Sequence, residues 1–337
     1  MNKPKDEPGL QTILSHCGRN LEASGGYVNV PPYEGSTILH DDMEDLFGRV
    51  DNHLYGDGTA QTYGTDGGPT HEAFYDAMNK LEGGAGTWAF STGLAGCTIP
   101  MMAFLKTGDH MLVTDSVYGP TRQFCEVLLK NFGVEAEFYE PTIGAGIEKL
   151  IRPNTRLIYM ESPGTHTFEM QDVPAIAAVA RKYNIVTMID NTYATPLNFQ
   201  PLKHGVDVVV HSATKYICGH SDVLMSTVTC NEKNWKQVRD VCKMTGQYAS
   251  AQSVYLGLRG LRTLKVRLDA VGVHTRKVVD WLLKREEVKK VIWPAYEKDP
   301  GYRIYKRDYS GPIGLFAFQF QDQYTDVQIN RFMDSLK

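Results

Sequence analysis

The sequence has no apolar run of about eighteen residues, the length that a helix needs to cross a bilayer, so we expect no membrane span. Its first residues, MNKPKDEPGLQTILSH, are charged and contain proline, and they lack the apolar core of a secretory signal. The chain also has no basic excess, because its net charge is −4 and its lysines and arginines are scattered among acids. These absences argue against a membrane or nucleic acid as a partner.

Cysteine is sparse: the six cysteines are dispersed and form no CxxC pair. This pattern fits neither a zinc ligand set nor a small disulfide scaffold, so reduced thiols and a cytoplasmic location are the simple interpretation. We expect Cys125 and Cys218 to be small buried hydrophobes rather than nucleophiles. His211 and His220 are nine residues apart with no carboxylate or cysteine at ligand spacing, which favours ordinary packing over a metal site.

The length of 337 residues suits a large and a small domain. Residues 1–62 are rich in Gly, Pro, Asn and Asp, which predicts an irregular arm that lies against something else. Regular alternation begins near residue 70. Apolar strand candidates lie at residues 87–90, 110–115, 134–139, 156–161, 185–190, 206–212 and 223–230.

Helical patterns separate several of these strands. One pattern begins at Pro120 and stops at Gly133, and another has Asp172 as its cap, Pro174 just inside and Asn184 after its end. Strands that alternate with helices predict an α/β fold, with a mostly parallel sheet covered on both faces. In such a fold, ligands bind at the carboxyl ends of the strands.

After Gly260 the pattern changes to one long amphipathic helix, so we place a domain boundary there. The predicted apolar face is made of Leu261, Leu264, Leu268, Val271, Val278 and Leu282. In the second domain, WPAY predicts a turn and GPIGLFAFQF a strand, and residues 326–336 form a helical pattern with no stop signal. We therefore expect an arm (1–62), an α/β domain (63–260) and a C-terminal domain (261–337) that is cut short.

One lysine stands in an unusual place. In HSATKYICGHSD, residues 211–222, Lys215 follows an apolar strand and has Ser212 and Thr214 beside it. A lysine is most often a solvated surface residue, but two observations favour a site. In IDNTYATP, Asp190 ends the preceding strand and can reach the same edge of the sheet. In GAGTWAFSTGLAG, residues 84–96, a strand leads into the start of a helix, where backbone N–H groups can bind a phosphate.

These elements suit pyridoxal 5'-phosphate. A lysine can carry this cofactor as a Schiff base, an aspartate can keep its ring nitrogen protonated, and a helix start can bind its phosphate. Tyr118, in the DSVYGPT turn after a strand, is either an ordinary turn residue or a ring that stacks on the cofactor. The glycine-rich segment lacks the Gly-Lys-Ser/Thr ending of a P-loop and the spacing of a dinucleotide fingerprint.

The segments ESPGTHTFEMQDVPAI, IDNTYATP, SATKYICGHSDV and RGLRTLKVRL resemble the Cys/Met-metabolism family of pyridoxal-phosphate enzymes. The resemblance covers nearly the whole chain and implies the type I, aspartate aminotransferase-like fold of these enzymes. It implies that Lys215 is the Schiff-base lysine, Asp190 the partner of the ring nitrogen and Tyr118 the stacking ring. The implied phosphate-binding positions are Gly93, Leu94, Ser212 and Thr214. Tyr63 matches a tyrosine that reaches in from a neighbouring subunit, so a homodimer or homotetramer with shared active sites is implied.

The same resemblance indicates a reaction. ESPGTHTFE lacks the Asn-Pro that γ-cleaving members carry after ESP, and VYGPTRQFC is similar to the β-cleaving form. This implies β-elimination of an amino-acid thioether, with L-cystathionine giving homocysteine, pyruvate and ammonia in methionine biosynthesis. γ-Cleavage and cysteine S-conjugates as substrates remain alternatives.

Two departures from the family pattern matter. The usual Tyr-Gly-Arg-Arg-Gly is replaced by Tyr63, Gly64, Thr65, Asp66 and Gly67, which removes an arginine that pairs with the cofactor phosphate. Losing one such bond costs about 1.5 to 3 kcal/mol, and Asp66 would add repulsion if it pointed inward. The family's arginine for the substrate carboxylate belongs to a C-terminal part that this chain does not contain. A weakened or inactive cofactor-binding remnant is therefore the second hypothesis.

Overall fold

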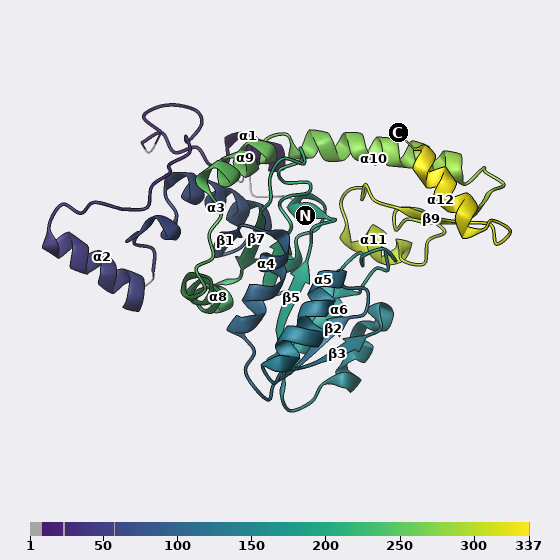
Figure 1. Ribbon diagram of the computed structural model, residues 1–337, viewed down its shortest axis with the longest axis horizontal. Helices are drawn as coiled ribbons and strands as arrows, with labels where there is room; N and C mark the ends of the chain where they lie inside the picture. Colours follow the sequence, from purple (N-terminus) through teal and green to yellow (C-terminus); the bar gives the residue numbers. More distant parts are fainter. Residues whose placement is uncertain (1–8, 23, 57, 337) are drawn as a thin grey trace.

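A seven-stranded sheet forms the centre of the computed structural model, which describes residues 9–22, 24–56 and 58–336 (Figure 1). The strand order is β1-β7-β6-β5-β4-β2-β3. Strands β2 to β6 run parallel, whereas β7 is antiparallel to β6 and β1 is antiparallel to β7. The strands are β1 (Gly86–Phe90), β2 (His110–Thr114), β3 (Glu135–Tyr139), β4 (Thr155–Glu161), β5 (Val186–Asp190), β6 (Val208–His211) and β7 (Ser226–Cys230). The predicted α/β fold and all seven predicted strands are confirmed, with ends that differ by at most a few residues.

Helices cover both faces of this sheet. The α-helices of the described residues, some of which lie away from the sheet, are α1 (Leu10–His16), α2 (Met43–Tyr55), α3 (Pro69–Glu82), α4 (Gly93–Thr98), α5 (Gly119–Gln123), α6 (Val173–Lys182), α7 (Thr195–Asn198), α8 (Glu232–Met244), α9 (Ala251–Leu261), α10 (Leu264–Leu282), α11 (Tyr302–Asp308) and α12 (Asp326–Ser335). The 3-10 or π-helical segments are η1 (Gly64–Asp66), η2 (Ile99–Ala103), η3 (Phe124–Leu129), η4 (Pro141–Leu150) and η5 (Pro201–His204). None of the helices in the described part of the chain combines the length and apolar character needed to span a membrane.

Successive side chains of a strand point to opposite faces of the sheet, so each layer of helices contacts every second residue. Leu157 and Tyr159 of β4 point into a core that also contains Cys97 of α4 and Val238 of α8. Ile158 and Met160 point to the other face, and the core there contains side chains of α6 and η4. Both faces of the parallel part of the sheet are therefore buried, as its apolar strands require.

Of the two helices predicted between strands, one is confirmed at its start and the other is only partly right. The start of α6 is as predicted, because the Asp172 carboxylate accepts a hydrogen bond from the Ala175 N–H at 3.3 Å, and Asn184 adopts a positive φ of 53° after the helix ends. The pattern from Pro120 to Gly133 is not one α-helix. It begins as α5 and continues as the π-helical turn η3, in which the backbone is more widely wound.

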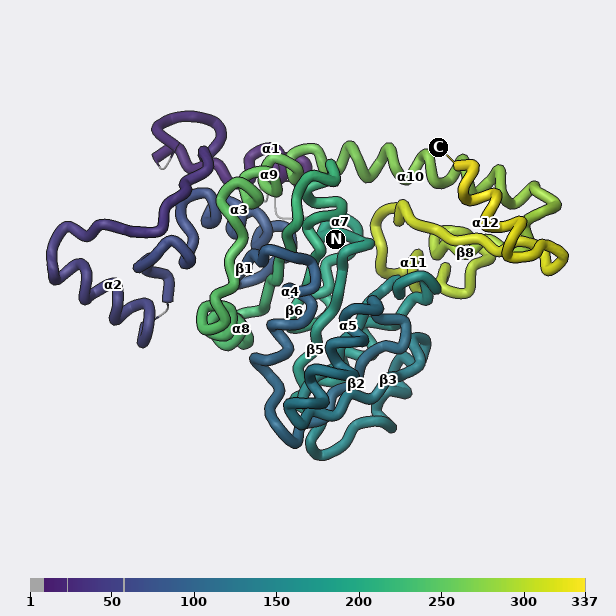
Figure 2. The backbone as a smooth tube through the Cα atoms, in the orientation of Figure 1, coloured from purple at the N-terminus to yellow at the C-terminus, as the bar shows by residue number. Residues whose placement is uncertain are grey.

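The arm differs from the irregular segment that the composition predicts. It contains α1, whose Leu14 packs into the core, and α2, which is capped by the Asp42 carboxylate through the Asp45 N–H at 2.8 Å. No residue of α2 is buried, so core packing does not stabilise this helix within the chain. Its stability comes from local contacts, namely the Asp42 cap and the acidic side chains of its first turn. In Figure 2, α2 and the C-terminal elements lie at opposite ends of the chain's long axis.

The predicted long helix after Gly260 was also wrong in part. Residues 262 and 263 separate α9 from α10, so Leu261 belongs to the earlier helix. Val278 is 44% exposed, and the buried face of α10 is instead formed by Leu264, Leu268, Gly272, Thr275, Val279 and Leu282. These positions follow the helical repeat more closely than the predicted set does.

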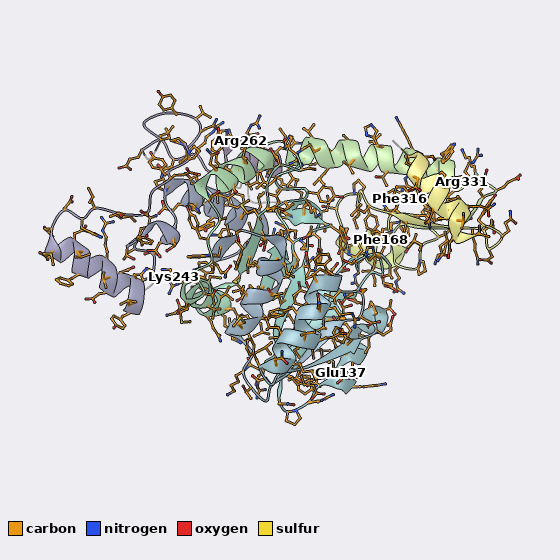
Figure 3. The ribbon with its side chains drawn as sticks, in the orientation of Figure 1. Glu137, Phe168, Lys243, Arg262, Phe316 and Arg331 are labelled. Atoms are coloured by element: carbon orange, nitrogen blue, oxygen red, sulfur yellow. The ribbon has the colours of Figure 1, made fainter. Side chains whose placement is uncertain are left out.

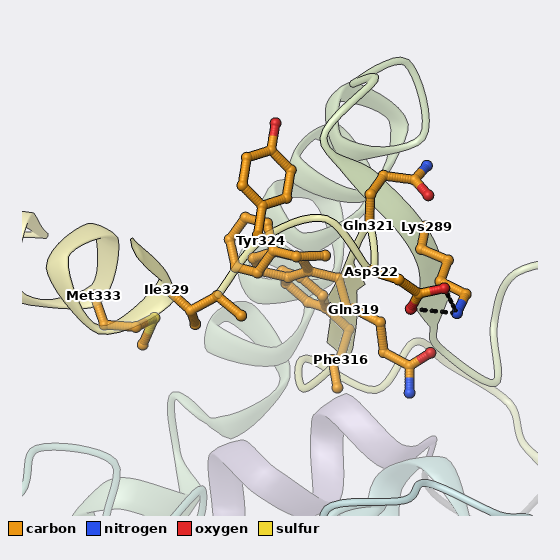
Figure 4. Close-up of a pocket in the computed structure, with 11 residues that line it drawn as sticks. Lys289, Phe316, Gln319, Gln321, Asp322, Tyr324, Ile329 and Met333 are labelled. Atoms are coloured by element: carbon orange, nitrogen blue, oxygen red, sulfur yellow. Dashed lines mark hydrogen bonds and ion pairs between the residues drawn. The ribbon is translucent and has the colours of Figure 1, made fainter. Parts of the chain in front are cut away.

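In the C-terminal part, the predicted strand and final helix are β9 (Ala317–Phe320) and α12, and β9 pairs in an antiparallel sheet with β8 (Val288–Ile292), which was not predicted. A cavity of about 780 Å³ lies between this sheet and α12 (Figure 4). Its walls include Phe316, Phe318, Tyr324, Ile329 and Met333, and Lys289 pairs with Asp322 at its rim. These walls are mainly apolar and belong to the C-terminal elements, whereas Lys215 and Asp190 belong to the part of the chain that forms the seven-stranded sheet.

Candidate active site

Two carboxyl groups lie side by side at the carboxyl edge of the parallel sheet. Glu161 ends β4 and Asp190 ends β5, and the two residues are partners in the parallel register. Register partners on neighbouring strands project to the same face, which here is the face covered by α4. Glu161 is 4% exposed and Asp190 8% exposed. The edge therefore has two nearly buried carboxyls close to one another.

The Asp190 carboxylate is fixed by its own loop. Its Oδ1 accepts hydrogen bonds from the backbone N–H and the hydroxyl of Thr192, and the Cys97 thiol lies 3.5 Å from Oδ2. The Thr192 hydroxyl oxygen in turn accepts the Ser212 N–H at 2.8 Å. This chain of bonds connects Asp190 to the segment that follows β6, which carries the lysine.

Backbone bonds hold that segment in a compact turn. The Lys215 N–H donates to the Ser212 carbonyl at 3.0 Å, and the Gly219 N–H donates to the Lys215 carbonyl at 2.8 Å. The Thr214 hydroxyl donates to the Met225 carbonyl at 3.1 Å and accepts the Met225 N–H at 2.9 Å. Thr214 thus links the turn to the segment before β7, whereas Lys215 is exposed.

The start of α4 lies directly against Ser212. A Cβ atom built on Gly93 would be 2.3 Å from the Ser212 hydroxyl oxygen, so the hydroxyl can keep this position only beside glycine. The Thr92 hydroxyl caps the helix by accepting the Ala95 N–H at 3.2 Å, and the Ser226 hydroxyl holds the Thr92 carbonyl at 2.7 Å. The first N–H groups of a helix have no intrahelical acceptor, so the amides of Gly93 and Leu94 and the Ser212 hydroxyl form a donor set suited to a phosphate.

Tyr118 precedes α5, and its ring is 45% exposed. Its N–H donates to Glu161 Oε2 at 2.8 Å, and the Thr165 hydroxyl donates to Glu161 Oε1. Burial, together with the neighbouring Asp190 carboxyl, raises the pKa of Glu161 to about 8. Tyr118 is therefore attached through its backbone to the carboxyl pair, and its ring remains accessible for stacking on a planar ligand.

The structure brings Asp190, Ser212, Lys215, Gly93 and Tyr118 to one edge of the sheet. Tyr63 does not join them within the chain. It lies on the arm, is 52% exposed and forms an isolated bridge with Thr37. It lines a separate cavity of about 130 Å³ with His53 and Lys243 among its neighbours.

Asp66, which stands where an arginine was expected, turns toward its own chain. One carboxylate oxygen accepts the N–H groups of Thr62 at 2.8 Å and Tyr63 at 3.1 Å. The other lies 3.4 Å from His53 Nδ1 and 3.9 Å from Lys243 Nζ. Lys243 is on α8, at the side of the domain from which the arm extends (Figure 3). The Asp66 charge is thus engaged within the arm and α8.

Sequence reasoning did not identify Glu161, Thr192 or Cys97 as parts of the site. A signal for Glu161 was available, because it ends a predicted strand in the same way as Asp190. Thr192 and Cys97 had no comparable signal, since a threonine in a loop and a cysteine in a helix are common in any chain. Only their contacts with Asp190 show what they do.

The described residues fit pyridoxal 5'-phosphate. The Gly93–Ser212 contact forms a cradle that a side chain would fill, and it supplies neutral donors without a carboxylate among them. Asp190, with Glu161 beside it, supplies a carboxyl group suited to a protonated ring nitrogen. Ser212 connects the parts of the site, because its N–H bonds the Thr192 hydroxyl of the Asp190 loop, its hydroxyl borders Gly93, and it lies three residues before Lys215.

Comparison with known proteins identifies the family of this chain. A cystathionine β-lyase of Haemophilus influenzae is 39% identical over 96% of this chain and 82% of its own length. Cystathionine β-lyase MetC of Escherichia coli is 37% identical over 97% of this chain and 82% of its own. The crystal structure of cystathionine γ-lyase from Lactobacillus plantarum in complex with L-serine matches with a TM-score of 0.86 and 29% identity, covering 94% of this chain and 79% of that one. The expectation of a cut C-terminal end is not borne out by these comparisons. The family described as Cys/Met metabolism PLP-dependent enzyme matches residues 11–337, and the chain belongs to this family of pyridoxal-phosphate enzymes.

Proposed function

We propose that this protein is a carbon–sulfur lyase that cleaves L-cystathionine by β-elimination to homocysteine, pyruvate and ammonia. Relatives that cover almost the whole chain at 39% and 37% identity are named cystathionine β-lyases, which supports the β-cleaving assignment. The one observation that carries the proposal is the bonded path from Asp190 through Thr192 and Ser212 to the backbone of Lys215. This path places an acid and a lysine at one edge of the sheet.

Bound pyridoxal phosphate would supply an electron-withdrawing ring that lowers the barrier to breaking bonds at the substrate's α-carbon. Asp190 would hold the ring nitrogen in its protonated form, and the amides of Gly93 and Leu94 with the Ser212 hydroxyl would bind the phosphate. Tyr118 would cover one face of the ring. The exposed Lys215 amine would bind the cofactor, take the α-proton and return a proton to the leaving sulfur.

Absorbance and product measurements test this proposal directly. The purified protein is titrated with pyridoxal phosphate, and a band near ~420 nm, typical of the lysine-bound cofactor, is expected. Addition of L-cystathionine should then release pyruvate. Lys215→Ala should lose both signals, and Lys203→Ala, which removes an exposed lysine bonded to Gln200 elsewhere on the surface, should keep both. Pyruvate release by Lys215→Ala equal to wild type would refute the proposal.

The same assay separates the alternatives. A band without turnover would favour the cofactor-binding remnant, in which Thr65 in place of the phosphate arginine has weakened or removed catalysis. Release of 2-oxobutyrate instead of pyruvate would indicate γ-cleavage. Pyruvate from S-alkyl cysteines at a higher kcat/KM than from L-cystathionine would indicate a cysteine S-conjugate β-lyase.

We also propose a cytoplasmic homodimer or homotetramer in which Tyr63 enters the neighbouring subunit's site. All six cysteines are buried and unpaired, which is compatible with a reducing compartment. The exposed Tyr63 and the arm helix α2, none of whose residues is buried, are consistent with an arm that lies on a partner. Mixing Lys215→Ala with Tyr63→Ala subunits should restore activity that neither variant has alone, since one hybrid site then has both residues. No recovery in verified mixed oligomers would refute the shared site.

A further inference from the structure

Glu161 contacts two loops that border the site. Its Oε2 accepts the Tyr118 N–H at 2.8 Å, and its Oε1 accepts the Thr165 hydroxyl. The same two loops also meet directly, because the Thr165 N–H donates to the Ser116 carbonyl at 2.8 Å. A Cβ atom on Gly164 would be 2.2 Å from the Ser116 hydroxyl oxygen, so the loops are tightly packed. Glu161 is the side chain that ties both loops to the end of β4.

Among the described residues, none of the groups that act most strongly on Glu161 is a positive side chain. It faces Asp190 from β5, Cys97 from α4 and Tyr159 from its own strand. Tyr193, from the loop after β5, the Tyr118 N–H and the Thr165 hydroxyl also face it. Burial and the neighbouring Asp190 carboxyl both disfavour the charged form of Glu161, because like charges in a buried site repel each other. This agrees with the raised pKa of Glu161, about 8.

A cationic ring nitrogen beside Asp190 would change that balance. It would supply the missing positive charge and allow Glu161 to ionise, so binding of the ring would release a proton from Glu161. The ionised carboxylate is also the stronger acceptor for the Tyr118 N–H and the Thr165 hydroxyl. Ligand binding would therefore tighten the attachment of the ring that covers the ligand.

We propose that Glu161 is a positioning residue of this site: it fixes Tyr118 through the backbone and, with Asp190, forms a two-carboxyl floor that selects a positively charged ring nitrogen. This inference rests on the proposed use of pyridoxal phosphate and assigns a second acid to it. Glu161 acts through Tyr118 and Asp190, and its contribution is to affinity and orientation.

The two roles can be separated by substitution. Glu161→Gln keeps an oxygen that can accept the Tyr118 N–H but removes the ionisable group, whereas Glu161→Ala removes both. Glu140→Gln is the matched control, because Glu140 directly follows the parallel strand β3 at the edge of the same sheet and is exposed. Each protein without cofactor is titrated with pyridoxal phosphate from about pH 6 to pH 8, and Kd is followed by absorbance and by the circular dichroism of the bound ring. Thermal unfolding of the cofactor-free proteins establishes that each is folded.

We expect Glu161→Ala to weaken cofactor binding by about tenfold or more and to change the ring's circular dichroism, since the bond that holds Tyr118 is lost. Glu161→Gln should keep the dichroism. Its Kd relative to wild type should nevertheless rise with pH, by up to about tenfold per pH unit, the limit for one linked proton. Titration of the free cofactor affects both proteins equally and cancels in this ratio. Glu140→Gln should follow wild type throughout.

Equal Kd values for wild type and Glu161→Gln at every pH would overturn the two-carboxyl floor, and an unchanged dichroism in Glu161→Ala would overturn the positioning of Tyr118. Either result in a wild type that binds the cofactor leaves the proposed function intact. Failure of the wild type to bind pyridoxal phosphate would overturn both. If Glu161→Ala does not fold, the pH dependence and dichroism of Glu161→Gln still decide the question.

Discussion

The contact between Gly93 and Ser212 predicts the result of adding a single methyl group to the site. In Gly93→Ala the new Cβ would be 2.3 Å from the Ser212 hydroxyl oxygen but 3.4 Å from Ser212 Cβ. Rotation of the hydroxyl to another rotamer therefore relieves the overlap without backbone movement. The cost to stability should be small, because the hydroxyl moves from one staggered position to another. The hydroxyl, however, would no longer point to the phosphate position.

Losing one hydrogen bond to a charged group costs about 1.5–3 kcal/mol, which corresponds to a cofactor Kd raised by about ten- to 150-fold. Equilibrium titration with pyridoxal phosphate measures this change, and thermal unfolding of the cofactor-free protein measures the stability. Gly119→Ala is the matched control, because Gly119 also begins a short helix after a strand and an added Cβ there meets nothing within 4 Å.

A double-mutant cycle identifies the cause. Ser212→Ala removes the hydroxyl, so Gly93→Ala added to it should have little further effect on Kd. Fully additive losses in the double variant, or cofactor binding by Gly93→Ala as tight as in wild type, would refute the reasoning about this contact.

Three further predictions concern the carboxyl groups. Asp66→Ala should destabilise the arm locally by about 1–3 kcal/mol, because it leaves the N–H groups of Thr62 and Tyr63 without their acceptor; faster hydrogen exchange of these two amides would show it, and unchanged protection would contradict it. Glu82→Ala should lower the free energy of unfolding by about 1–3 kcal/mol, since it removes the acceptor of the buried His211 side chain; an unchanged urea midpoint would contradict this. For the cofactor-free protein, a Glu161 pKa raised from 4.5 to about 8 means that the folded state holds a proton that the unfolded state releases. Its contribution to stability should be present below about pH 4.5 and decline as the pH rises to about 8, and Glu161→Gln should lack this decline in urea unfolding.

The architecture was largely predictable from local patterns. Each strand of the main sheet is a short apolar run bounded by turn residues, and the cap at Asp172 and the stop at Asn184 mark α6 in the sequence. The arm and α10 were less predictable. The helix α2 buries no residue, so the compositional bias toward turn residues outweighed its pattern, and the break at residues 262–263 has no glycine or proline to mark it.

Lys215, Asp190 and the start of α4 could be assigned to one site because parallel strands bring their carboxyl ends to one edge, a rule that depends on strand order alone. The roles of Glu161, Thr192 and Cys97 depend on which side chains meet across loops. Their distances in the sequence carry no information about these contacts: Cys97 and Asp190 are 93 residues apart, and Tyr118 and Glu161 are 43 apart.

The sequence by itself determined the family, the cofactor and the fold class, because these follow from residue types at fixed spacing and from apolar periodicity. The tertiary structure alone decided that Asp66 turns toward His53 and Lys243, that Gly93 closes onto Ser212 and that a second acid lies beside Asp190. The physical reason is that the direction of a side chain, its burial and the charges beside it depend on the packing of several elements at once, and no single segment contains that information.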